Sequence, residues 1–315
     1  NGSAWVQLGA EINGEALGDR AGHSVSLSPD GLRLAIGAPE NDGTGSDSGH
    51  VRVYEWRTNS WVQLGAEING EAAGDASGYS VSLSTDGARV AIGAPGNDVN
   101  SRLNSGHVRV YSWNGTSWVK LGDDIDGEAA DDLSGWSVSM SGDGSRVAIG
   151  AKWNAGNGAE SGHVRVYSWI NSAWVQLGVD INGEAIGDES GHSVSLSTDG
   201  AWLAIGAPLN GGTGTNSGHV RIYFWNGVAW ALVTTDINGE AASDESGYSV
   251  ALSGNGQSVV IGALNNNAND SGHVRVLGTV QSLFTPAPSP NNPQQNPAPA
   301  PAPACLLYTS DAADE

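Results

Sequence analysis

The sequence has a single cysteine, Cys305, few basic residues and no long apolar run. One cysteine excludes a disulfide framework within the chain and a zinc site built from paired thiols. No segment approaches the roughly 18 consecutive apolar residues that a membrane-spanning helix needs. Lys and Arg total 13 against 34 Asp and Glu, and the net charge of -21 repels nucleic acid and anionic membrane surfaces. We therefore expect neither nucleic-acid binding nor membrane insertion.

An internal repeat fills most of the chain. A tryptophan in the motif Trp-Val-x-Leu, or a variant of it, recurs at intervals of 56 or 57 residues, and so does the glycine of a Gly-Ala-Pro motif. The tryptophans are Trp5, Trp61, Trp118, Trp174 and Trp230. A fixed period of this length is typical of stacked or radially arranged units, none of which can bury its apolar face alone. Because residues 1–5 match the interior of a copy, we expect the chain to start inside a longer array.

Each copy predicts four short antiparallel strands. In the second copy the alternating or β-branched segments are residues 78–84, 88–93, 107–113 and 118–122. Asp86-Gly87 and Asn114-Gly115 are hairpin turn signals, because these residues tolerate positive φ. Four strands in about 56 residues is the size of a propeller blade. The sequence therefore predicts an all-β fold, a β-propeller of four-stranded antiparallel blades with five repeats; a flat β-solenoid is the alternative.

The repeats end near residue 280. Eight of the 12 prolines lie between Pro286 and Pro303, so residues 281–304 are expected to be a disordered linker or stalk. Residues 305–315 match no copy and are expected to be a non-native tail. We expect the propeller to occupy residues 1–280. Closure of five blades would require residues 5–12 to pair beside residues 273–277 as a missing fourth strand.

The order of motifs resembles a known family. Gly-x-Ser-Val-x-Leu-Ser-x-Asp-Gly, then Val-Ala-Ile-Gly-Ala-Pro, then Ser-Gly-His-Val-Arg-Val-Tyr is similar to the FG-GAP repeat of integrin α-chain propellers, over residues 1 to about 279. The resemblance implies a propeller that serves in adhesion outside the cell. Integrin propellers have seven blades, so the resemblance allows the five repeats here to be a fragment of a seven-bladed propeller. Integrin propellers hold calcium between the first and second strands, but here that loop is only a tight turn at Asp86-Gly87. Those calcium sites therefore cannot be transferred.

A different loop has calcium-like spacing. The loop from the fourth strand to the next copy (the 4→1 loop) carries oxygen-bearing side chains at relative positions 1, 3, 5 and 9, which suits a cation that takes six to eight oxygens. The strongest candidates are Asp124, Asp126, Glu128 and Asp132; Asp180, Asn182, Glu184 and Asp188; and Asp236, Asn238, Glu240 and Asp244. The loops that begin with Glu11 and Glu67 are weaker candidates. The alternative is that all these acids are solvated and cap strand ends.

The candidate ligand face comprises the 4→1 loops and the loops from the second to the third strand (the 2→3 loops). In a four-stranded meander both connections emerge on one side, and here they are long and variable, as binding loops usually are. Tryptophans and charges outside the repeat pattern are the best contacts. The candidate ligand residues are Trp153, Lys152, Trp136, Asp42, Asp47 and Asp98. Repeated histidines at the start of the third strand are expected to be hydrogen-bonded braces, and the repeated arginines ties between blades.

No catalytic arrangement stands out, because nearly every polar residue is a five-fold copy. We therefore predict a non-catalytic extracellular module, secreted or anchored at the cell surface, that binds a protein or glycan, with calcium as the candidate cofactor. The alternatives are a carbohydrate-binding propeller and an accessory domain of a secreted hydrolase. Because carboxylates are plentiful, a glycoside hydrolase is the alternative if the chain is an enzyme.

Overall fold

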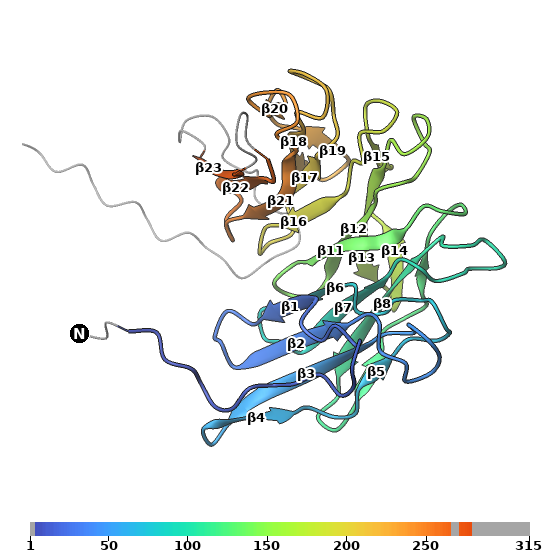
Figure 1. Ribbon diagram of the computed structural model, residues 1–315, viewed down its shortest axis with the longest axis vertical. Helices are drawn as coiled ribbons and strands as arrows, with labels where there is room; N and C mark the ends of the chain where they lie inside the picture. Colours follow the sequence, from blue (N-terminus) through green and yellow to red (C-terminus); the bar gives the residue numbers. More distant parts are fainter. Residues whose placement is uncertain (1–3, 266–270, 279–315) are drawn as a thin grey trace, which may run out of the picture. The chain divides into compact units, whose positions relative to one another are not determined.

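The computed structural model describes residues 4–265 and 271–278, which belong to one compact unit, Asn1–Thr279 (Figure 1). Strands joined by turns and irregular loops form this part of the chain, and it contains no helix long and apolar enough to cross a membrane. The expected linker at 281–304 and the expected tail at 305–315 lie outside the described residues. The predicted all-β fold of four-stranded antiparallel blades is confirmed.

Five sheets follow one another along the chain. The first blade contains β1 (Ser24–Leu27), β2 (Arg33–Ala38), β3 (His50–Arg57), β4 (Ser60–Gln63) and β5 (Ile68–Asn69). The second contains β6 (Ser80–Leu83), β7 (Arg89–Ala94), β8 (His107–Trp113), β9 (Trp118–Lys120) and β10 (Ile125–Asp126). The third contains β11 (Ser134–Met140), β12 (Arg146–Ala151), β13 (His163–Ile170), β14 (Ala173–Gln176) and β15 (Ile181–Asn182).

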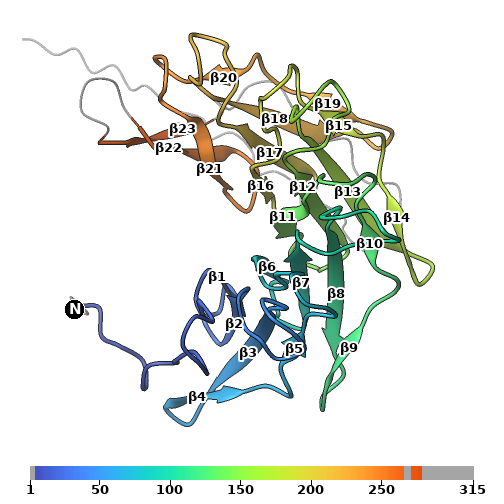
Figure 2. The same ribbon diagram turned by 45° about the vertical axis from the view of Figure 1, so that its right-hand side comes forward.

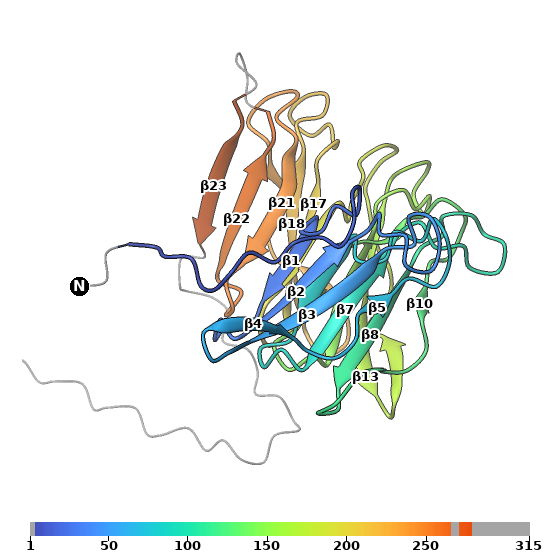
Figure 3. The ribbon, with the colours of Figure 1, turned by 60° about the horizontal axis from the view of Figure 1, so that its bottom comes forward.

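The last two blades repeat this plan with one difference. The fourth contains β16 (Ser193–Leu196), β17 (Trp202–Ala207), β18 (His219–Trp225), β19 (Trp230–Leu232) and β20 (Ile237–Asn238). Within residues 246–265 and 271–278, the fifth consists of β21 (Ser246–Leu252), β22 (Ser258–Ala263) and β23 (His273–Gly278). In the described chain β23 pairs only with β22, at the edge of its sheet (Figure 3).

The fourth strand of each complete blade is broken into two pieces. In the first blade β4 pairs with the end of β3 and β5 pairs with its beginning, so that Asn69 lies opposite His50. At the break, Gly65 has a φ of 79°, and a Cβ there would lie 2.7 Å from the ring of Trp113 in the next blade. The break therefore makes room for an aromatic ring of the neighbouring blade.

The apolar cores lie between consecutive blades. Ala35, Val51 and Val53 of the first blade form one cluster with Val81, Leu83, Val90 and Ile92 of the second. The same arrangement recurs at the following junctions, where the first strands of neighbouring blades lie side by side (Figure 2). Each blade thus buries its faces against its neighbours, as the repeat period predicts.

The glycine of the Gly-Ala-Pro motif lies where two blades approach most closely. A Cβ on Gly93 would lie 2.1 Å from the backbone oxygen of Gly135, and a Cβ on Gly150 would lie 2.0 Å from that of Gly191. Both contacts join the second strand of one blade to the first-strand region of the next. The repeat keeps glycine here because any side chain would push the blades apart.

The motif tryptophans also join the blades. Trp118 packs across its hairpin against Trp113, with ring centroids 5.4 Å apart, and its Nε1 donates a hydrogen bond of 2.8 Å to the backbone oxygen of Leu64 in the preceding blade. Trp61, Trp174 and Trp230 make the same bond to Leu8, Leu121 and Leu177. The predicted structural role of the paired tryptophans is therefore confirmed.

Replacing Trp118 with alanine should lower the free energy of unfolding by about 2–4 kcal/mol, because the half-buried ring packs against the core between the first and second blades. Urea unfolding measures the change. Trp153→Ala is the matched control, since Trp153 is 39% exposed and should cost less than about 1 kcal/mol. Equal costs for the two variants would contradict the inter-blade role.

Closure through the first residues does not occur in this structure. Residues 4–12 form no strand, and Trp5 is fully exposed, at 102%. The fifth copy has Leu277 where Tyr111, which pairs with Lys120 of the fourth strand, stands in the second copy. The suggestion that residues 5–12 pair beside residues 273–277 is therefore wrong for this arrangement.

Candidate functional site

A row of aromatic rings runs across the first strands of all five blades. One position, directly after the glycine that precedes or opens the first strand, supplies every ring. We call these residues the aromatic row: His23, Tyr79, Trp136, His192 and Tyr248. Consecutive ring centroids are 4.6, 4.5, 5.9 and 4.7 Å apart. His23 and Tyr248 are exposed, so solvent reaches both ends of the row.

A charged cluster adjoins the row between the third and fourth blades. Lys152, which follows β12, places its Nζ 3.7 Å from the ring centroid of Trp136 and 3.3 Å from Oε2 of Glu189. The indole Nε1 of Trp153 donates a hydrogen bond of 3.1 Å to Oε1 of the same carboxylate, and Nδ1 of His192 lies 3.2 Å from Oε2. We call these five residues the Glu189 cluster.

The cluster holds its charges in place. Burial opposes ionisation of Glu189, but the hydrogen bonds from His192 and Trp153 and the Lys152 ammonium outweigh it and lower the pKa of this carboxyl to about 2. The Lys152 side chain is only 9% exposed and that of Glu189 only 13%. Trp153 remains 39% exposed. The arrangement presents one exposed indole above a rigid ion pair.

Three of the predicted ligand residues therefore meet in one place, namely Trp136, Lys152 and Trp153. The predicted acids lie elsewhere. Asp42 accepts a hydrogen bond from the backbone N–H of Asp47 within the 2→3 loop of the first blade, and Asp98 accepts one from Asn104 in the corresponding loop of the second. These acids close their own loops and do not adjoin the Glu189 cluster.

Sequence reasoning missed Glu189 and His192. Glu189 occupies a repeated position with positive φ that holds Arg20, Ala76, Leu133 and Glu245 in the other copies. This variability was the available signal, because a strained position that changes from copy to copy is not needed for the blade itself. For His192, the sequence indicated only that it occupies the same repeat position as Trp136.

The 2→3 and 4→1 loops pack on one another and form one face, as the chain direction predicts. In the first blade Thr44 Oγ1 donates a hydrogen bond of 2.7 Å to the backbone oxygen of Gly70, and a bridge joins Gly49 to Ser77. Lys152 begins a 2→3 loop, and Glu189 ends a 4→1 loop. The Glu189 cluster therefore lies on the predicted ligand face.

The acids of one 4→1 loop do not act as one set. In the third copy, Oδ2 of Asp132 accepts hydrogen bonds from the backbone N–H groups of Glu128 and Ala129 and from the side chain of Asn154, at 2.9–3.2 Å. This position therefore braces the loop, and Asp188 and Asp244 accept the same backbone bonds in their copies. Calcium binding by these acids stays a prediction.

The acids at the first and fifth positions of these loops instead lie next to the repeated histidines. In the described chain four groups have one ligand atom per residue, all within 4.8 Å of one another. They are Glu15, His50 and Glu67; Glu71, His107 and Asp124; Glu128, His163 and Asp180; and Glu184, His219 and Asp236. Asp124 and Glu128, from the same loop, belong to different groups. These groups could hold a metal ion.

The third position of each 4→1 loop binds the arginine of the next blade through its backbone oxygen. Arg109 donates a hydrogen bond of 2.8 Å to the backbone oxygen of Asn69 in the preceding blade, and Arg165 donates one of 2.6 Å to that of Asp126. Arg52, Arg221 and Arg275 do the same to Asn13, Asn182 and Asn238. The predicted arginine ties between blades are confirmed.

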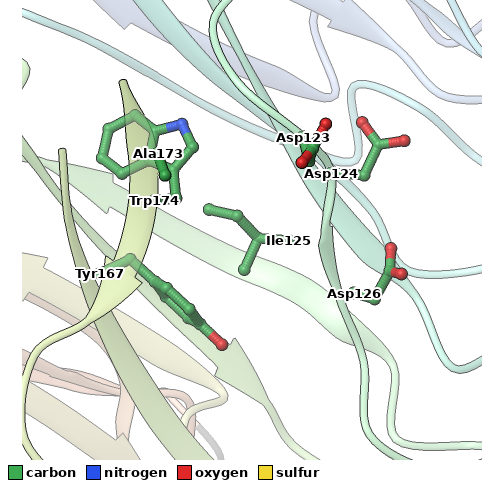
Figure 4. Close-up of a pocket in the computed structure, with 7 residues that line it drawn as sticks. All are labelled: Asp123, Asp124, Ile125, Asp126, Tyr167, Ala173 and Trp174. Carbon is green, nitrogen blue, oxygen red and sulfur yellow. The ribbon is translucent and has the colours of Figure 1, made fainter. Parts of the chain in front are cut away.

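Asp126 differs from its counterparts, which are all asparagine. Burial and the neighbouring Asp124 carboxylate raise its pKa. Figure 4 shows Ile125 pointing toward Tyr167 and Trp174, with Asp124 and Asp126 on the other side of the chain. The alternation places the apolar residue in the core and leaves the two acids half-buried on the opposite side of the segment.

Comparison with known proteins supports the family assignment of the repeat. A family model described as the FG-GAP repeat matches residues 124–167, from the start of one 4→1 loop into β13, and the predicted FG-GAP repeat is confirmed. No curated protein matches the chain in sequence.

Two solved structures are similar in fold. Hydrazine synthase of Kuenenia stuttgartiensis is 15% identical over 81% of this chain and 71% of its own, with a TM-score of 0.49. The periplasmic gluconolactonase PpgL of Pseudomonas aeruginosa is 16% identical over the same shares, also with a TM-score of 0.49.

The prediction that the chain is not an enzyme is wrong as an exclusion. The solved structures that are similar in fold include the periplasmic gluconolactonase. Polar residues that are copied five times cannot form a single constellation. The Glu189 cluster is different, because it gathers at one place residues that differ from copy to copy.

Proposed function

We propose that the chain is an extracellular propeller that binds a glycan on its 2→3 and 4→1 face, along the aromatic row and at the Glu189 cluster. The observation that carries this proposal is the position of Trp153, whose indole is 39% exposed and fixed by Glu189. A sugar ring offers apolar C–H faces and a rim of hydroxyl groups. An exposed aromatic ring beside a few fixed polar groups complements both.

The shape of the site supports an elongated ligand. The aromatic row crosses five consecutive blades, whereas the Glu189 cluster occupies one junction. We expect the row to contact successive sugar units and the cluster to orient one of them. The net charge of -21 disfavours polyanions, so neutral or amino-sugar glycans are the preferred class.

Replacing Trp153 with alanine should weaken glycan binding at least about tenfold, because truncating an exposed aromatic anchor typically costs more than 1 kcal/mol. A glycan array identifies the oligosaccharide, and calorimetric titration measures its affinity. Trp169→Ala, in the hairpin at the opposite end of the third blade, is the control and should retain binding.

Equal losses in the two variants would show that folding, not contact, determines the affinity. If no neutral or amino-sugar oligosaccharide bound at millimolar concentration, the glycan proposal would fail. Binding of a surface protein that Trp153→Ala abolishes would replace the glycan by a protein ligand at the same face.

A further inference from the structure

Four blades each bring together three groups that can bind a metal ion. We call these groups the blade sites. Each takes a histidine from the start of the third strand, an acid from the break in the fourth strand, which we call the exit acid, and a glutamate from the loop that enters the blade, the entry glutamate. In the third blade these are His163, Asp180 and Glu128. The three residues are more than 15 positions apart in sequence, so only the fold unites them.

The histidines are buried without a hydrogen-bond partner at the nitrogen that faces the acids. His50, His163 and His219 are each 1% exposed, and Nδ1 of each has no partner in the described part of the chain. The distances from Nδ1 to Oε2 of the entry glutamates are 3.9, 3.8 and 3.7 Å, too long for hydrogen bonds. A buried polar atom left unpaired costs free energy, so each site is built to hold something between the histidine and the acids.

The charges of the blade sites favour a cation. In the third blade the guanidinium of Arg165 lies 3.5 Å from Oε1 of Glu128, which leaves Oε2 facing the imidazole. Burial, followed by the nearby Arg165 charge, lowers the pKa of His163 to about 4, so the ring is neutral at pH 7 and its lone pair is available. Two carboxylates and one guanidinium leave a net negative charge beside that lone pair.

We propose that the blade sites of the first, third and fourth blades bind a divalent first-row transition metal ion, with zinc as the probe, through the histidine Nδ1 and two carboxylates. Imidazole and carboxylate together suit such an ion, whereas calcium takes six to eight oxygens. Two ligands at about 2.0–2.2 Å from one zinc ion lie at most roughly 4.4 Å apart, so the histidine–glutamate distances already fit.

The second blade contains an internal control. There Lys120 Nζ lies 2.8 Å from Oδ1 of the exit acid Asp124, and the buried ring nitrogen without a partner is Nε2 of His107. The ammonium repels a cation, whereas the uncharged amide of Gln176, which donates the equivalent hydrogen bond of 2.7 Å to Oδ1 of Asp180, does not. Glutamine stands in place of Lys120 in the first and third blades and leucine in the fourth. We therefore expect the second blade site to stay empty.

Titration of the chelator-treated protein with zinc at pH 7 should show about three ions per chain. His163→Ala and the milder Glu128→Gln should each lower this number to about two, because each removes a ligand of one site. His107→Ala is the matched control, since it removes an equally buried histidine yet should leave about three ions bound. Lys120→Gln should raise the number to about four.

The absence of heat at millimolar zinc would overturn the proposal. The proposal would also fail if Glu128→Gln and His107→Ala bound the same number of zinc ions, since Glu128→Gln is a mild change that should keep the fold. Calcium binding that neither variant alters would overturn the proposal and would assign the cation to the acids within single 4→1 loops. Trp153→Ala should leave zinc binding unchanged, so failure of the glycan proposal and failure of this one are distinguishable.

Discussion

Gly150→Ala should lower the free energy of unfolding by about 3 kcal/mol or more, because overpacking against backbone cannot be relieved by a rotamer change. The added Cβ would lie 2.0 Å from the backbone oxygen of Gly191 in the next blade. Separating these groups means moving one blade away from the other and opening the core between them. Urea unfolding followed by tryptophan fluorescence measures the loss.

The fifth copy supplies the matched control. Gly262 occupies the same motif position, but its Cβ would make one close contact, with Oγ of Ser249 at 2.3 Å, and the nearest backbone atom would lie 3.8 Å away. That hydroxyl can rotate away, so Gly262→Ala should cost far less than Gly150→Ala. If the two alanine variants unfolded at the same urea concentration, the close approach of the blades would not exist in solution.

Acidification from pH 7 to about 4.5 should destabilise the metal-free protein by several kcal/mol. Burial lowers the pKa of His107, His163 and His219 to about 4, against 6.5 for an unperturbed histidine. Between these values the unfolded chain binds protons that the folded chain does not. Stability is therefore present in full above about pH 6.5 and is lost as the pH falls toward 4, by on the order of 3 kcal/mol per histidine.

Urea midpoints at pH 7 and pH 5 in the presence of a chelator measure this effect. Replacing His163 with glutamine should flatten the pH dependence in that window, since one titrating group is removed. The Glu189 carboxyl stays ionised in this window, because its pKa is about 2. Stability that did not change between pH 7 and pH 5 would contradict neutral buried histidines.

The strands were predictable because their signal is local. The predicted segment 107–113 matches β8, and 88–93 differs from β7 (Arg89–Ala94) by one residue at each end. The short strand β5 was not predicted, since two residues carry no periodicity. The break before it was not predictable either, because it depends on the ring of Trp113 from the following blade.

The candidate sites could be predicted only in part. Trp136, Lys152 and Trp153 departed from the repeat pattern, and this departure pointed to the place where they meet. Glu189 could not be connected to them, because it comes from the next copy. Spacing within one loop suggested that Asp124 and Glu128 act together. In the structure each pairs with a histidine of a different blade, which only the path of the fourth strand determines.

The bond from Arg109 to the backbone of Asn69 has a consequence for how such chains change in length. Every junction between blades is formed by residues of two successive copies. The same repeat positions form all of these junctions. Loss or gain of one whole period, by unequal exchange between repeated stretches of the gene, regenerates an intact junction wherever it occurs. A deletion that removes part of the strands at a junction breaks the tie and the core beneath it. Array length in this lineage should therefore vary in whole copies, and the smallest heritable step is one blade.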